Sequence, residues 1–201
     1  MKIVNCDEAG LAAAAEVLLA GGVAVIPTDT VYGLAAHPGI PAAVERLYTI
    51  KGREAKKPIA LLAADADALP RFGYPLVGES PRLAALWPGA LTLVIDPQSS
   101  TATPRPPEGF RIPDHAWTRR LLAKCGGLLR VTSANLSGQR PATDAPQALA
   151  DVGLSADLVV DDGVSPGGVP STVVRVRADG SHEILREGAT RRFQIGERTA
   201  M

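Results

Sequence analysis

Short apolar runs alternate along the chain with alanine-rich segments of helical period. The first part predicts a strand over residues 1–5, a helix over residues 11–19 and a buried strand over residues 23–26. Asp7 is a suitable N-cap for the helix, and a glycine pair ends it. This order of elements is typical of an α/β domain.

The rest of the chain continues in the same manner. Further strands are expected over residues 59–63, 91–95, 110–113, 128–131, 158–161, 171–176 and 182–185. Further helices are expected over residues 41–50, 65–72, 80–87, 115–124 and 144–152. Strands alternate with helices at first and gather toward the end, which predicts an α/β fold with a mixed sheet and one core. We expect one domain over residues 1–190 and a polar C-terminal tail over residues 191–201.

Three polar segments lie beside the ends of predicted strands, over residues 28–33, 51–58 and 133–138. Ligands of open α/β sheets collect at such strand ends. The middle segment places four cations within seven residues, Lys51, Arg53, Lys56 and Lys57. Arginine and lysine both suit phosphate oxygens, so this segment is either a phosphate-binding loop or a solvated basic turn.

Two other features can be interpreted either as parts of a functional site or as ordinary surface structure. Arg111 stands between two apolar residues of a predicted strand, where it would bind a carboxylate in a groove or face solvent. The Ser/Thr/Pro-rich segment 97–107 is either a lid or an idle surface loop.

Composition limits these interpretations. With 201 residues, 46% of them hydrophobic and 21% charged, the chain has the composition of an ordinary globular protein, and it is long enough for one large domain or at most two small ones. The formal net charge is zero, so a site for nucleotides or nucleic acid must come from a local patch. We see no membrane span and no signal peptide, and we expect a cytoplasmic protein.

Most familiar catalytic and metal-binding motifs are absent. The sequence has no GxxxxGK[ST], GxGxxG, HExxH or GxSxG motif. Cys6 and Cys125 are not in a CxxC spacing, and the three histidines are scattered, so no residue is assigned as a metal ligand. Asp161 and Asp162 are either a cation site or, as we favour, a solvated turn. Ser133 has no identifiable base, so it is interpreted as a hydrogen-bonding residue. The residues alone predict an anion-binding α/β enzyme or binding module.

Six motifs in order resemble the YrdC-like family of threonylcarbamoyl-AMP synthases, and the match runs from Val23 to about Gly188. They are PTDTVYGL at 27–34, KGR at 51–53 with KP at 57–58, WPGALT at 87–92, RIP at 111–113, SANLSG at 133–138 and STV at 171–173. Because the chain stops soon after Arg186, it is similar to the single-domain members.

The resemblance implies an open, twisted sheet around a concave, positively charged cavity. It implies that L-threonine, bicarbonate and ATP, with Mg²⁺ on the nucleotide, give threonylcarbamoyl-AMP and pyrophosphate. A partner threonylcarbamoyl transferase complex would then modify adenosine 37 of tRNA. Mg²⁺ would be held mainly by phosphate oxygens and water, so this chemistry needs no protein metal motif.

The resemblance also implies roles for individual residues. Threonine would be bound by Thr30, Arg111, Val131 and Ser171, with Arg111 on its carboxylate. ATP would be bound by Arg53, Lys57, Ser133 and Arg186, and the catalytic set would be Lys51, Arg53, Ser133 and Asn135. Attack of a carbamate oxygen on the α-phosphorus needs positioning and charge neutralisation more than a side-chain nucleophile.

The sequence departs from the family pattern in two places. Lys57 and Leu62 stand where longer members have Asn and His, which implies more electrostatic phosphate binding. The Pro-rich segment before Arg111 has no counterpart to the family's ATP-contacting Thr, so that edge of the nucleotide site is unassigned.

Two other functions are compatible with the same motifs. A non-catalytic module of this fold would bind double-stranded RNA or tRNA, although zero net charge disfavours a broad RNA-binding surface. A carbamoyl-transfer domain, as in hydrogenase-maturation proteins, is disfavoured because we see no fused domain. Threonine-dependent turnover of ATP separates the synthase from the RNA-binding module.

Overall fold

Ten strands form one mixed sheet in the computed structural model, which describes residues 1–52, 58–97, 105–177 and 179–196. The strand order is β1-β8-β2-β3-β7-β4-β6-β5-β9-β10. The strands are β1 (Lys2–Asn5), β2 (Val23–Ile26), β3 (Gly33–Ala36), β4 (Leu61–Ala63), β5 (Leu91–Ile95), β6 (Glu108–Arg111), β7 (Leu128–Ser133), β8 (Leu158–Asp161), β9 (Thr172–Val176) and β10 (His182–Arg186). The helices are α1 (Glu8–Leu19), α2 (Pro41–Lys51), α3 (Ala68–Arg71), α4 (Ser80–Ala84), α5 (Ala116–Lys124), α6 (Ala145–Asp151) and α7 (Arg192–Ile195), with a 3₁₀ turn at Gly153–Ser155.

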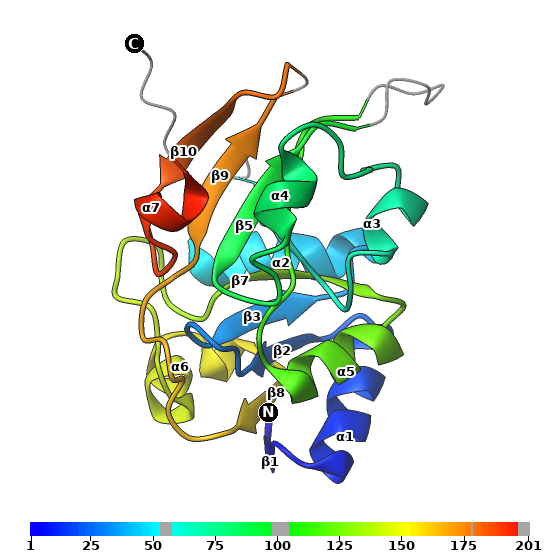
Figure 1. Cartoon of the computed structure of the whole chain (residues 1–201). Helices are drawn as coiled ribbons and strands as arrows, with labels where there is room; N and C mark the ends of the chain where they lie inside the picture. Colours follow the sequence, from blue (N-terminus) through cyan, green and yellow to red (C-terminus); the bar gives the residue numbers. More distant parts are fainter. Residues whose placement is uncertain (53–57, 98–104, 178, 197–201) are drawn as a thin grey trace.

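Helices cover both faces of the half of the sheet that contains β1, β8, β2, β3 and β7 (Figure 1). Helices α1 and α5 lie side by side on one face, where Leu11, Leu18 and Leu121 pack against Ile26. Helices α2 and α6 contribute Leu47 and Ala148 to the opposite core. Every residue of β2 is buried because this strand is covered on both sides, which explains its uninterrupted apolar sequence.

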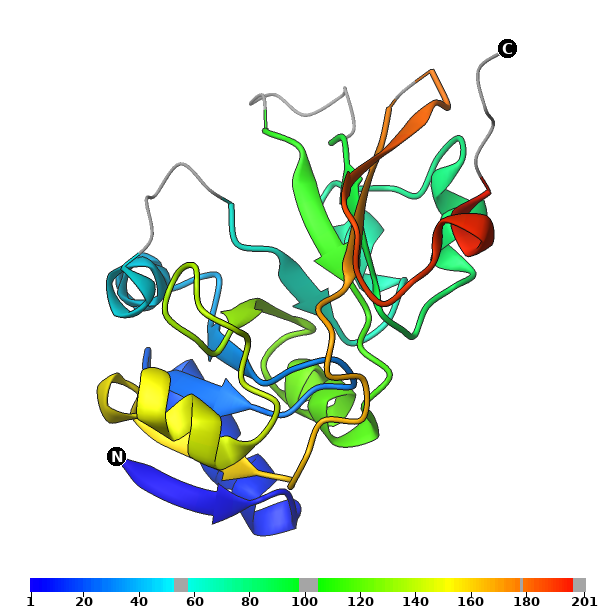
Figure 2. The same ribbon diagram turned by 90° about the vertical axis from the view of Figure 1, so that its left-hand side faces the viewer.

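The other half of the sheet is covered on one face only. Helices α3, α4 and α7 pack on β5, β6 and β9 through a third core (Figure 2). Along β5 the residues Leu91, Leu93 and Ile95 point into this core, whereas Thr92 and Val94 point to the opposite face. That opposite face forms one wall of the cavity described below.

The sequence predicted the type and order of most elements. The predicted α/β fold with a mixed sheet flanked by helices is confirmed, and Asp7 caps α1 by accepting a hydrogen bond of 2.8 Å from Gly10 N. Strand β3 was missed. Its sequence, GLAA, lacks the β-branched and aromatic residues typical of strands, and it is held in the sheet by pairing with β2 and β7.

The helix expected over residues 80–87 begins where predicted and is shorter than predicted. Helix α4 ends at Ala84 and is preceded by Glu79. The Ser80 hydroxyl donates to the carbonyl of Val77 at 2.7 Å instead of accepting from the helix.

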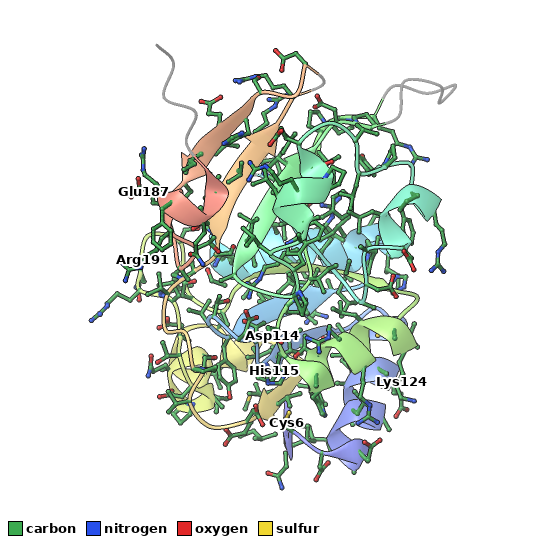
Figure 3. All side chains as sticks on the ribbon, viewed as in Figure 1. Cys6, Asp114, His115, Lys124, Glu187 and Arg191 are labelled. Carbon is green, nitrogen blue, oxygen red and sulfur yellow. The ribbon has the colours of Figure 1, made fainter. Side chains whose placement is uncertain are left out.

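The expected polar tail begins with a folded helix. Residues 192–195 form α7, and Ile195 is fully buried in the third core. Arg82 of α4 donates to the carbonyl of Ile195 at 2.9 Å. Glu187 and Arg191 are exposed on the surface beside this helix (Figure 3). A single buried isoleucine in a polar segment gives no periodic pattern from which a helix could be predicted.

The helices in the described part of the chain were also compared with the length and hydropathy of a membrane span. None of them is both long and apolar enough to cross a membrane.

Candidate active site

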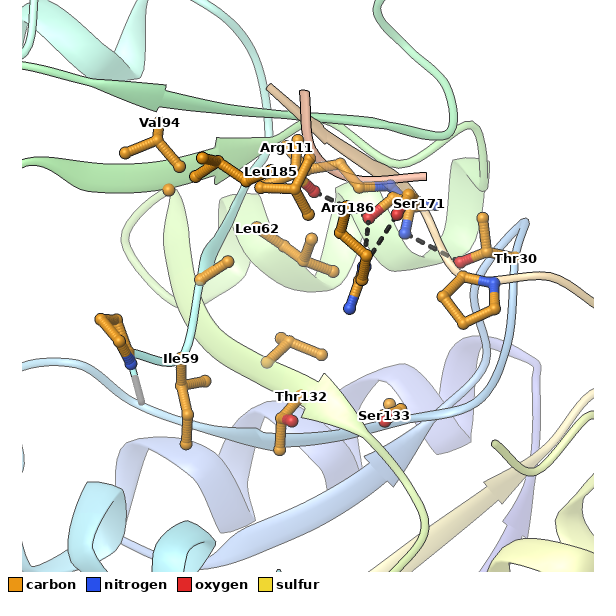
Figure 4. Close-up of a pocket in the computed structure, with 18 of the residues that line it drawn as sticks. Thr30, Ile59, Leu62, Val94, Arg111, Thr132, Ser133, Ser171, Leu185 and Arg186 are labelled. Carbon is orange, nitrogen blue, oxygen red and sulfur yellow. Dashed lines mark hydrogen bonds between the residues drawn. The ribbon is translucent and has the colours of Figure 1, made fainter. Parts of the chain in front are cut away.

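A cavity of about 570 Å³ lies between the two halves of the sheet (Figure 4). One wall comes from the β2–β3 connection and β7, and the other from β5, β6, β9 and β10. The charged residues in its described lining are Glu108, Arg111, Arg175 and Arg186. Hydroxyl groups are supplied by Thr28, Thr30, Thr92, Thr132, Ser133 and Ser171, together with Tyr32. Such a lining suits a polar, anionic ligand.

Most of the site residues expected from the sequence meet at this cavity. Six of them line it: Thr30, Arg111, Val131, Ser133, Ser171 and Arg186. Lys51 and Asn135 are buried behind Ser133 and do not belong to the lining. Arg53 and Lys57 lie outside the described residues, so their roles stay predictions.

Arg111 is held by three different groups at one end of the cavity. Its Nε donates to the carbonyl of Gly89 at 2.9 Å, and its Nη1 donates to Thr30 Oγ1 at 2.8 Å. Its Nη2 forms an ion pair with the carboxylate of Asp29. The guanidinium is thus fixed in a plane with one edge already bound to a carboxylate, which is the anion that its fork of donors matches.

Burial lowers the pKa of Arg111 from its usual value. The nearby Asp29 opposes this shift, and the positive charge of Arg186 adds to it. An arginine stays cationic in proteins despite such a shift. Arg111, which is buried, and Arg186, which is exposed, therefore favour an anionic group between or beside them.

The hydroxyl of Thr30 has a defined orientation. Thr28 Oγ1 donates to the carbonyl of Val31 at 2.7 Å, so its proton is not available for Thr30. Thr30 Oγ1 lies 3.0 Å from Thr28 Oγ1 and therefore donates to it, while accepting from Arg111. The polar segment after β2 acts as a rigid support for the guanidinium.

Ser171 joins Arg186 to β5. Its hydroxyl lies 2.8 Å from Thr92 Oγ1, and its carbonyl accepts from Arg186 Nη2 at 2.8 Å. Figure 4 shows Arg111, Arg186, Ser171 and Thr30 together at one end of the cavity, with Ser133 and Thr132 across from them. The two groups of residues face each other across the space for a ligand.

Lys51 ties the end of α2 to the polar segment after β7. Its Nζ donates to the carbonyl of Ser133 at 2.6 Å, the carbonyl of Asn135 at 2.8 Å and Asn135 Oδ1 at 3.2 Å. The amide of Asn135 in turn donates to the carbonyls of Leu136 and Gln139 at 2.9 and 2.7 Å. This buried ammonium fixes the backbone on which Ser133 stands.

Three residues of the cavity lining were missed by reasoning from the sequence, namely Thr92, Glu108 and Arg175. Asp29, the ion-pair partner of Arg111, was missed as well. Arg175 was recognisable in principle. In β9, Thr172, Val174 and Val176 are buried, so Ser171, Val173 and Arg175 share the cavity face. Glu108 gave no such signal, because its partner Arg130, at 2.5 Å, comes from β7.

Replacing Gly188 by alanine is expected to disturb this site. A methyl group there would lie 2.3 Å from the carbonyl oxygen of Pro170 and 2.5 Å from that of Ser171, so backbone must move. Overpacking of this kind costs about 1–3 kcal/mol. We expect a lower melting temperature and weaker binding of the ligand held near Ser171, measured by thermal unfolding and calorimetric titration. Gly39→Ala is the matched control, since only the exposed ring of His37 is near. Unchanged behaviour of Gly188→Ala would contradict the tight packing of Gly188 against Ser171.

Comparisons with known proteins agree with this arrangement. The Sua5/YciO/YrdC family profile, described as "Telomere recombination", matches residues 16–188. The threonylcarbamoyl-AMP synthase of Bacillus subtilis is 33% identical over 198 residues, covering 96% of this chain and 57% of the relative. The human threonylcarbamoyl-AMP synthase is 37% identical over 191 residues, covering 90% of this chain and 67% of the relative. The crystal structure of P. abyssi Sua5 complexed with L-threonine superposes with a TM-score of 0.85 at 28% identity, covering 94% of this chain and 58% of that one. This chain thus spans little more than half the length of two of these proteins.

Proposed function

Because the chain belongs to the Sua5/YciO/YrdC family, we propose that it is a threonylcarbamoyl-AMP synthase. It condenses L-threonine and bicarbonate to a carbamate, with loss of water. A carbamate oxygen then attacks the α-phosphorus of ATP and expels pyrophosphate. The product serves a threonylcarbamoyl transferase complex that modifies adenosine 37 of tRNA in the cytoplasm.

The observation that carries this proposal is the fixed guanidinium of Arg111 inside a cavity lined by hydroxyl groups. A guanidinium has five N–H donors, and Gly89, Thr30 and Asp29 use three of them, so one donor on each terminal nitrogen remains for the carboxylate of an amino acid. Thr30 and Ser171 stand beside it and would contact the amino group and side chain of threonine. P. abyssi Sua5, a relative of the same fold, has been crystallised with L-threonine.

The opposite end of the cavity is proposed to hold ATP. Ser133 and Arg186 line the cavity from facing walls and would contact the nucleotide, and Arg53 and Lys57 would add positive charge from the basic segment. Lys51 and Asn135 act by fixing Ser133, not by direct contact with the nucleotide. Mg²⁺ accompanies the triphosphate through phosphate oxygens and water.

The chemistry fits the residues present. No cysteine or histidine belongs to the described lining of the cavity, so nothing there resembles a nucleophile with its base. Transfer to the α-phosphorus requires that the carbamate be positioned in line and that charge be neutralised. Arginines and hydroxyl groups on two facing walls provide both.

Release of pyrophosphate from ATP by the purified protein tests the proposal. We expect release of pyrophosphate that requires both L-threonine and bicarbonate. This release should be lost in Arg53→Ala, whose melting temperature should equal that of the wild type. Binding of ATP without release under any combination would exclude the synthase. Binding of tRNA or double-stranded RNA by the same inactive protein would support the non-catalytic module instead.

A further inference from the structure

Three potential metal ligands meet beside the ends of β1 and β8. Cys6 directly follows β1, Asp162 directly follows β8, and His115 precedes α5. The Sγ of Cys6, a ring nitrogen of His115 and a carboxylate oxygen of Asp162 all lie within 4.8 Å of one another. None of the three belongs to the cavity lining. Figure 3 shows Cys6 and His115 in the lower half of the molecule.

The sheet itself brings two of these groups together. Strands β1 and β8 are parallel, and the register pairs Asn5 with Asp161. The backbone N–H of Cys6 donates to the carbonyl of Asp161 at 2.9 Å. Cys6 and Asp162 therefore leave the same edge of the sheet as neighbours, in a place fixed by backbone pairing and not by a flexible loop.

The imidazole of His115 is oriented by its surroundings. Its Nε2 lies 2.9 Å from Asp162 Oδ2. Its Nδ1 accepts from the N–H of Thr118 at 3.2 Å, which caps α5, and lies 2.9 Å from Thr118 Oγ1. The hydroxyl proton of Thr118 is donated to the carbonyl of Pro27 at 2.7 Å. Zn²⁺ on Nε2 requires the tautomer with a proton on Nδ1, in which that N–H donates to Thr118 Oγ1 in place of the capping hydrogen bond from Thr118 N. Metal-binding histidines are commonly held in this way through their other nitrogen.

We propose that Cys6, His115 and Asp162 form a Zn²⁺ site with water as the fourth ligand. Sulfur, imidazole nitrogen and carboxylate oxygen together suit zinc, whereas Mg²⁺ and Ca²⁺ prefer oxygen ligands alone. Ligand atoms in tetrahedral zinc sites are separated by about 3.5 Å. The longer separations, up to 4.8 Å, must therefore shorten by about 1 Å, and the 2.9 Å contact between His115 Nε2 and Asp162 Oδ2 must open slightly. The side chain of Asp162, 42% exposed, has room to turn, and water has access on this side.

A Cys–His–Asp cluster also resembles a nucleophile with its base, but this thiol is unsuited to that role. Burial, with a hydrogen bond to Asp162 and the negative charge of that residue, raises the pKa of Cys6 to about 12. A protonated thiol is a poor nucleophile. A bound zinc ion instead displaces the thiol proton to solvent and supplies the positive charge next to Asp162.

The site connects to the active-site cavity through Tyr32. The N–H of Asp162 donates to the Tyr32 hydroxyl at 2.9 Å, and that hydroxyl donates to the carbonyl of Gly163 at 2.8 Å. Tyr32 lines the cavity. A zinc ion would therefore pin the ends of β1 and β8 to α5 and stiffen the turn that supports one cavity wall.

Titration of the reduced full-length chain with Co²⁺, a spectroscopic substitute for zinc, tests the thiolate ligand directly. We expect a near-ultraviolet charge-transfer band from thiolate to cobalt in the wild type and in Cys125→Ser. The same band should be absent in Cys6→Ser. Cys125 is the matched control, since it is the other cysteine of the chain and lies at the opposite end of α5 from His115. No band in the wild type, or a band that survives in Cys6→Ser, would overturn the proposal.

Competition with a chromophoric chelator measures the affinity for Zn²⁺ itself. We expect a loss of at least 100-fold in Cys6→Ser and in His115→Asn, whose amide still caps α5. Thr118→Val should weaken binding by about 10- to 100-fold, as loss of a residue that orients a ligand does. Zn²⁺ should raise the melting temperature of the wild type and of Cys125→Ser, and not that of Cys6→Ser. Equal affinities in the wild type and Cys6→Ser would refute the site, whatever the enzyme activity.

Discussion

Replacement of Arg111 by alanine is expected to lower kcat/KM for L-threonine by at least about 100-fold, because the proposed carboxylate ligand is lost. A hydrogen bond to a charged group contributes about 1.5–3 kcal/mol, and the guanidinium can form two with a carboxylate. The variant is also expected to be less stable, because Asp29 would keep a carboxylate that is largely buried and has lost its cation. Breaking a buried pair from one side costs about 3–5 kcal/mol.

The two effects can be separated with a second variant. In Arg111→Ala combined with Asp29→Ala, the unpaired carboxylate is removed, so urea unfolding should show recovered stability. Turnover at low threonine should stay as poor as in the single variant. Steady-state kinetics with threonine and ATP varied separately measure this. A lower kcat/KM for ATP with an unchanged kcat/KM for threonine would contradict the placement of Arg111 at the threonine end.

Replacement of Lys51 by methionine is expected to abolish most activity and to destabilise the fold by about 3 kcal/mol or more, because several buried acceptors lose their donor at once. The carbonyls of Ser133 and Asn135 and the side-chain oxygen of Asn135 all depend on its ammonium. The segment that carries Ser133 would then lose its link to α2. Urea unfolding and pyrophosphate release measure the two effects.

Lys124→Met provides the control for this experiment. Lys124 lies in the last turn of α5 and is exposed, so the same substitution there removes a charge without removing buried contacts. We expect wild-type stability and turnover in that variant. Loss of turnover in Lys51→Met without any loss of stability would instead indicate direct contact between Lys51 and the substrate.

Local patterns predicted the elements of this fold well where periodicity was long and clear. Helix α1 and strand β2 were found with nearly their observed limits, since the first has its cap and the second is buried on both faces. Strand β3 and helix α7 were not found, because GLAA and RFQI acquire their structure from neighbours distant in sequence. The order of the strands was beyond local reasoning for the same reason.

The candidate site was predicted in part. The motifs identified six residues that line one cavity. The catalytic role that the resemblance gave Lys51 stays a prediction, and the structure shows its ammonium bound to carbonyls of the segment after β7. Its acceptors lie 82 and 84 residues further along the chain, so no local pattern could reveal them. Asp29 was overlooked because an acidic residue in a polar turn usually faces solvent, and only the fold brings Arg111 to it.

The strand order has a consequence for synthesis of the protein on the ribosome. Strand β1 pairs with β8, which begins at Leu158, and β5 pairs with β9, which begins at Thr172. Both halves of the sheet therefore lack a strand until the last quarter of the chain has been made. Folds dominated by such distant pairings form slowly and expose unpaired edges meanwhile. Most of this domain must therefore leave the ribosomal exit tunnel before either half of its sheet can close.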